Sequence, residues 1–154
     1  MSSHGLRIAF FGSSLVSAYW NEAATYYRGI LRALHARGHR VTFYEPDAPD
    51  GLERCLEAAR GADVVVKASG VGVFDELLEA RVLDLQSGNT QVIFWDMDAP
   101  ATLERMEKNP NDPFRALVPR YDRILTYGGG DPVVLAYKDF GARDCVPIYN
   151  AMDP

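Results

Sequence analysis

The chain has 154 residues, of which 47% are hydrophobic and 24% charged, and its formal net charge is −5. This composition is typical of one globular domain with a core of its own. The negative charge argues against a nucleic-acid-binding surface, which needs clustered Lys and Arg. No apolar run approaches the ~20 residues of a membrane span.

The amino terminus and the cysteines bear on the location of the protein. The start, "MSSHGLRIAFF", lacks the architecture of a signal peptide, because its apolar run is short and continues into the first predicted strand. Cys55 and Cys145 are too few for a metal site or a disulfide framework. We therefore expect two reduced thiols in a cytoplasmic protein.

Short apolar runs alternate with longer amphipathic segments along the chain. The predicted strands are 6–12, 40–46, 62–69, 90–96, 122–129 and 143–150. The predicted helices are 21–39, 52–61, 72–86, 99–109 and 131–141, with a helical turn at 114–120. We expect His39 in a tight turn between the first helix and the second strand. No repeat or linker interrupts the alternation, so we expect residues 1–154 to form a single domain.

This alternation predicts an α/β fold, a three-layer Rossmann-like domain with a mostly parallel six-stranded sheet. Right-handed crossovers leave two common strand orders, the dinucleotide-fold order 3-2-1-4-5-6 and the flavodoxin-like order. The six predicted strands favour 3-2-1-4-5-6. In either order, ligands bind at the carboxyl ends of the strands near the switch point. The loops that follow the strands therefore hold the candidate site residues.

Two carboxylates, Asp96 and Asp98, come directly after the apolar run "VIFW". Carboxylates at the end of a buried strand are costly unless water, a partner or a ligand meets them. Either could act as a general base on an acceptor hydroxyl, so both are candidate catalytic residues, with Asp98 preferred. The alternative for Asp98 is helix capping, because a carboxylate at a helix amino terminus is stabilised by the helix dipole. The sequence leaves both roles open.

The loop after the first strand contains Gly12, Ser13 and Ser14. The glycine permits close approach of a backbone or ligand, and the serines supply hydroxyls and amides. The loop does not match G-x-G-x-x-G, which argues against a nicotinamide dinucleotide site. The third predicted strand ends in "VVVKAS" instead of an acidic residue, which argues against a phosphorylation receiver domain.

Aromatic and glycine-rich segments complete the candidate binding residues. Tyr19, Trp20 and Asn21 precede the first long helix, where aromatic rings stack on a sugar or base or else cover the core.

The second such segment is "TYGGGDP". It places Tyr127, Gly128, Gly129 and Gly130 between a strand and a helix, leaving backbone amides for an anion or a closely approaching partner. The alternative is a loop of positive φ before a helix capped by Asp131.

Four segments together resemble the amino-terminal half of the CgeB-type glycosyltransferase-like proteins, named from spore maturation. They are "YWNEAATYYRGILRALHARGHRVTFYEPDA", "FWDMDAPATLERM", "YDRILTYGGGDPVV" and "GARDCVPIYNAMDP". The resemblance extends from about Leu6 to Pro154, and its most specific parts are "WDMDAP" and "TYGGGDP".

The resemblance implies a GT-B glycosyltransferase of two Rossmann-like domains. The first would bind a small-molecule or glycan acceptor and the second a nucleotide-sugar donor, which is a cosubstrate, with no metal or tightly bound cofactor. The cleft between the domains would be lined by residues 12–14, 19–21, 96–98 and 127–130. The chain ends at "YNAMDP", where family members continue into the donor domain. We therefore expect this domain to be inactive alone.

Two other classes of protein with the same fold are alternatives. A non-catalytic module would recognise a sugar, a nucleotide or a protein, and could form a homodimer. A flavodoxin-like carrier would bind flavin and be yellow. An exposed apolar patch would mark the surface on which a partner domain packs.

Overall fold

The computed structural model describes residues 4–12, 22–70, 72 and 74–149. The strands are β1 (Arg7–Phe11), β2 (Arg40–Tyr44), β3 (Val64–Ala68), β4 (Gln91–Asp96), β5 (Arg123–Tyr127) and β6 (Cys145–Ile148). The helices are α1 (Glu22–Ala36), α2 (Pro49–Ala59), α3 (Asp75–Arg81), α4 (Ala99–Lys108), α5 (Pro113–Leu117) and α6 (Gly130–Asp139). Short 3-10 helices, η1 (Val82–Leu85) and η2 (Val118–Arg120), follow α3 and α5. Every predicted element is present, and α2 begins earlier than predicted, at Pro49.

The strands form one six-stranded parallel sheet in the order β2-β1-β3-β4-β5-β6. The predicted α/β class and the Rossmann-like sheet are confirmed, and the order is close to the predicted 3-2-1-4-5-6. It differs in the position of β3, which lies between β1 and β4, so that β2 is an edge strand. The physical reason is burial: β2 leaves Arg40 and Thr42 exposed, whereas β3 buries Val65 and Val66. A strand covered on both faces must be apolar on both.

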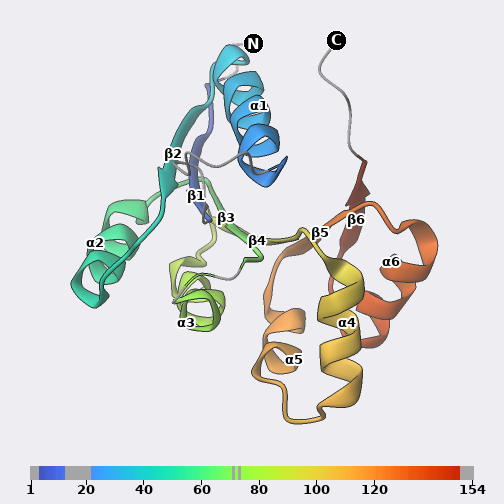
Figure 1. Ribbon diagram of the computed structural model, residues 1–154. Coiled ribbons are helices and arrows are strands. Elements are labelled where there is room, and N and C mark those ends of the chain that lie inside the picture. Colours follow the sequence, from blue (N-terminus) through green and yellow to red (C-terminus); the bar gives the residue numbers. More distant parts are fainter. Residues whose placement is uncertain (1–3, 13–21, 71, 73, 150–154) are drawn as a thin grey trace.

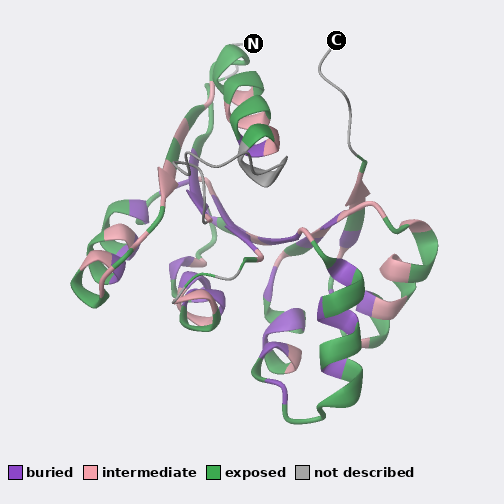
Figure 2. Ribbon diagram, in the orientation of Figure 1, coloured by how far each residue is buried: buried purple, intermediate pink, exposed green. Residues whose placement is uncertain are grey.

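The helices are divided unequally between the two faces of the sheet (Figure 1). The connection through α1 runs from β1 to β2, toward one edge of the sheet, whereas the later connections run toward the other edge, at β6. Because crossovers are right-handed, α1 covers one face of the sheet and the later helices cover the other. Tyr27 of α1 accordingly packs on Phe10 and Phe43. On the other face Phe94 contacts Phe114 of α5. Figure 2 shows the buried residues along the central strands and on the inner sides of the helices.

One half of the α1 face has no helical cover among the described residues. Over β4, β5 and β6, no described helix lies on this side of the sheet (Figure 1). Leu125 of β5 and Ile148 of β6 are only partly buried there. Leu125 and Ile148 therefore keep part of their surface exposed on the α1 side.

Buried charged groups anchor α3 to the sheet. Lys67 of β3 is fully buried, and its Nζ donates to Asp75 Oδ1 at 2.6 Å and to the carbonyl of Ala68. Glu79 of α3 is 4% exposed. Burial raises the pKa of the Glu79 carboxyl to about 7, although the nearby Lys67 ammonium lowers it. The backbone carbonyl of Glu79 accepts the hydroxyl of Tyr121 at 2.5 Å.

The turn after α1 holds His39 as predicted. Gly38 has a φ of 86° and ends the helical segment, a conformation that glycine adopts without strain. The imidazole Nδ1 of His39 accepts the backbone N–H of Leu6 at 3.1 Å. His39 therefore ties this turn to the residue that precedes β1.

The two thiols are free, as predicted, with Cys55 partly buried and Cys145 buried. Burial raises the pKa of the Cys145 thiol to about 11. In the part of the chain that the structure describes, no helix has both the length and the apolar character needed to cross a bilayer.

Candidate functional site

The predicted site residues fall at the carboxyl edge of the parallel sheet. Gly12 follows β1, the two aspartates end β4 and begin α4, and Tyr127 to Gly130 join β5 to α6. Because β4 and β5 are neighbours, with Asp96 opposite Thr126, the last two groups lie side by side. The remaining predicted residues, Ser13, Ser14, Tyr19, Trp20 and Asn21, lie outside the described residues.

Asp96 is fully buried, and its carboxylate is hydrogen-bonded within the protein. Oδ2 accepts the hydroxyl of Tyr137, and Oδ1 accepts Thr102 Oγ1 at 3.1 Å and the Asp98 N–H at 3.0 Å. Burial raises the pKa of Asp96, while these bonds and one from Ser69 lower it. The carboxylate thus joins β4 to α4 and α6 in the core. This geometry supports a structural role, and the catalytic role of Asp96 stays a prediction.

Asp98 is exposed and caps α4. Its Oδ1 accepts the N–H of Ala101 at 3.4 Å, a long bond. Capping, one of the two roles open to Asp98, is therefore present. The bond uses one carboxylate oxygen and leaves the side chain at the surface, so Asp98 remains available to meet an acceptor hydroxyl.

The three glycines of the β5–α6 loop all have positive φ, 74° for Gly128, 86° for Gly129 and 56° for Gly130. A side chain would be strained at each position, so the backbone conformation accounts for this unusual composition. Gly129 is the N-cap of α6, and no side chain caps the helix. The expectation that Asp131 caps α6 is wrong, because Asp131 lies inside the first turn. The first amides of α6 are therefore not covered by a capping side chain.

Gly12 continues the pairing of β1 with β2. Its N–H donates to the carbonyl of Tyr44 at 3.2 Å. A Cβ at Gly12 would lie 3.0 Å from the ring of Phe43, which is tighter than ordinary van der Waals contact. Glycine at this position therefore lets the aromatic ring of β2 pack against the end of β1.

A group of aromatic residues lies beside this edge on the α1 face, and only Tyr127 among them was predicted as a site residue. Tyr26 of α1 packs its ring 5.4 Å from Tyr127 and 5.8 Å from Trp95, both edge to face. Burial and the nearby Tyr127 hydroxyl raise the pKa of Tyr26. The ring of Tyr149 lies close to the positions where side chains at residues 128 and 130 would project.

The indole Nε1 of Trp95 is buried and has no hydrogen-bond partner in the described part of the chain. Buried polar groups in folded proteins are nearly always paired, and among the described residues this is the one buried side-chain donor without a partner. The sequence indicates on which face of the sheet Trp95 lies. Side chains alternate along a strand, so Trp95 shares a face with Ile93 and Met97, and Phe94 lies on the other face. Nothing in the sequence indicates that its N–H lacks an acceptor.

In comparisons of the sequence, no family model and no curated protein matches this chain. The site is therefore interpreted from its own geometry and chemistry.

Proposed function

We propose that this chain is the acceptor-binding domain of a glycosyltransferase that uses a nucleotide-sugar donor. The observation that supports the proposal is the convergence of three kinds of group at the ends of β4 and β5. These are the exposed carboxylate of Asp98, the glycine loop that opens α6, and the rings of Tyr26 and Tyr127 beside the buried indole of Trp95. A sugar presents hydroxyls to polar groups and an apolar ring face to aromatic residues.

Each group has a distinct part in this proposal. The Asp98 carboxylate accepts the proton of the attacking acceptor hydroxyl, which requires hydrogen-bond reach of that hydroxyl. The tyrosine rings provide the apolar surface for the sugar ring, and the buried indole of Trp95 packs against the ring of Tyr26. The nucleotide sugar is held by a second domain, so the described domain binds the acceptor without transferring sugar to it.

The test is a titration of the ¹⁵N-labelled chain with simple sugars and nucleotide sugars, followed by NMR. The chain has two tryptophans, so Trp95→Phe assigns the Trp95 indole signal by its disappearance. The proposal predicts saturable shifts of that signal and of the amides of Asp98, Gly129 and Gly130 with sugars.

Asp98→Asn is the matched variant, because asparagine caps a helix as well as aspartate does. The fold and sugar binding should persist in this variant, whereas transfer by a two-domain form should be lost. Turnover equal to that of the wild type in the Asn variant would refute the catalytic role of Asp98. Sugar binding without any transfer by a two-domain form would favour a non-catalytic binding module. If none of these signals shifts with any sugar, the proposed acceptor site is contradicted.

A further inference from the structure

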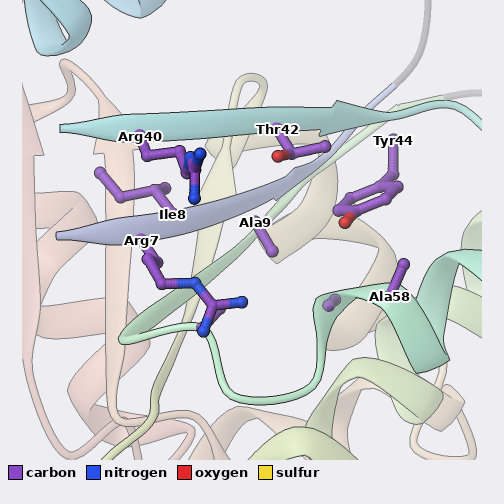
Figure 3. Close-up of a pocket in the computed structure, with 9 residues that line it drawn as sticks. Arg7, Ile8, Ala9, Arg40, Thr42, Tyr44 and Ala58 are labelled. Atoms are coloured by element: carbon purple, nitrogen blue, oxygen red, sulfur yellow. The ribbon is translucent and has the colours of Figure 1, made fainter.

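A cavity of about 240 Å³ lies on the face of the sheet that α2 covers, next to the edge strand β2. β1 and β2 form one side, and the end of α2 with the loop to β3 forms the other (Figure 3). The candidate site uses different strands and lies at the carboxyl ends of β4 and β5. Nothing in the proposed function uses this cavity.

Two arginines, Arg7 and Arg40, line one end of the cavity. They are directly opposite each other in the β1–β2 pair, and both are exposed. Figure 3 shows their side chains on the same side of the paired strands. Paired strands lie only about 4.8 Å apart, and like charges directly opposite on one face destabilise a sheet. The pair therefore has an electrostatic cost in the free protein.

No acidic side chain forms an ion pair with either guanidinium group within the described ranges of the chain. By contrast, Arg60 at the end of α2 forms an ion pair with Glu57 at 2.5 Å. Asp63 Oδ2 lies close by, but it accepts the backbone N–H of Arg7 at 2.7 Å. The chain as a whole has a net charge of −5, so two adjacent unpaired arginines are not a consequence of a basic surface.

The rest of the cavity offers hydroxyls and small side chains. Thr42 and Tyr44 follow Arg40 at period-2 spacing, so they face the cavity from the same side of β2. The opposite wall is made of alanines, of which Ala59 and Ala62 are buried. The cavity is smaller than the roughly 300–1,000 Å³ of sites for drug-sized ligands. Its ligand must therefore be small.

We propose that this cavity binds a small phosphate monoester, whose phosphoryl group is held by Arg7 and Arg40. A phosphate monoester carries about two negative charges and three acceptor oxygens at neutral pH, which matches two guanidinium groups and the hydroxyls of Thr42 and Tyr44. A carboxylate has one charge and two oxygens, so it would leave one arginine unneutralised. The alanines contact the carbon skeleton of the ligand.

The test is an NMR titration of the ¹⁵N-labelled chain with inorganic phosphate, glycerol 3-phosphate and acetate at constant ionic strength. We expect saturable shifts at the amides of Ala9, Thr42 and Ala62, with a Kd on the order of 1 mM for phosphate. Glycerol 3-phosphate should bind more tightly than phosphate, and acetate should not saturate. Acetate binding as tightly as phosphate, or shifts that grow linearly without saturation, would overturn the proposal.

Arg40→Gln and Arg32→Gln form a matched pair, because Arg32 is also exposed but lies on α1, on the opposite face. Arg40→Gln should weaken phosphate binding about tenfold or more, and Arg32→Gln should leave it unchanged. Without phosphate, Arg40→Gln should melt no lower than the wild type, because the like-charge contact is gone. Equal weakening by both variants, or a lower melting temperature of phosphate-free Arg40→Gln, would refute the site.

Discussion

Replacing Glu79 by glutamine should remove a pH dependence of folding stability. The carboxyl is 4% exposed, and burial raises its pKa from 4.5 to about 7. Lys67 and Arg105 oppose this increase, whereas Asp75 and Asp112 add to it. The folded state therefore holds the Glu79 proton at pH values where the unfolded chain has already released it.

The direction of the effect follows from proton linkage. Below pH 4.5 the carboxyl is protonated in both states, so its burial carries no ionic cost. Between pH 4.5 and about 7 only the unfolded chain ionises, so the free energy of unfolding falls as the pH rises. Above that range the loss is constant. At about 1.4 kcal/mol per pKa unit, the full loss is about 3–4 kcal/mol.

Urea denaturation of the wild type and Glu79→Gln at a series of pH values measures this effect. Glutamine keeps the shape of the side chain, and the backbone carbonyl that accepts from Tyr121 is unchanged. The two proteins differ at this one side chain, so contributions from the rest of the chain cancel in the difference. The stability of the glutamine variant relative to the wild type should rise by about 3–4 kcal/mol across the window. A difference that is constant with pH would refute the reasoning.

Two further predictions concern the carboxyl edge of the sheet. Tyr137→Phe should lower the free energy of unfolding by about 1.5–3 kcal/mol, because the buried Asp96 carboxylate loses a donor; an unchanged urea midpoint would contradict this. Gly129→Ala should destabilise by more than about 1 kcal/mol, since φ is 86° and a Cβ would overlap Val133. Gly29→Ala is the control: its added methyl meets nothing within 4 Å on α1, so it should stabilise by up to about 1 kcal/mol. Effects of the same sign in thermal melts would contradict the role of positive φ.

The pattern of polar and apolar residues within each strand predicts the strand order better than the number of strands does. In β2 the polar residues Arg40 and Thr42 alternate with apolar ones, whereas β3 reads "VVVKA" and is nearly all buried. Alternation is typical of a strand with one open face, and a continuous apolar run is typical of a central one. This contrast places β2 at the edge and β3 inside, as observed. The buried Lys67 interrupts that apolar run, and its partner Asp75 shows why the charge is tolerated.

The candidate site was predictable in its place but not in its chemistry. Asp96 and Asp98 were predicted from their position at the end of a strand. The hydrogen bond from Tyr137 to Asp96, however, depends on the fold, because Tyr137 lies on a helix distant in the sequence. Long-range hydrogen bonds of this kind have no local pattern in a sequence. The same holds for Trp95, whose contact with Tyr26 depends on how α1 crosses the sheet.

The outer edge of β6 affects how a strand from another chain can pair with the sheet. Asp144 and Ile148 accept hydrogen bonds from Ile124 and Gly128 of the β5 segment, so the backbone groups of Pro147 point to the open side. Proline has no N–H, and a strand from another chain would find no donor at this position. Edge-to-edge growth of the sheet, a common route to aggregation, is therefore disfavoured at β6. Self-association on this side is therefore expected to favour the faces of the sheet and its helices over this hydrogen-bonding edge.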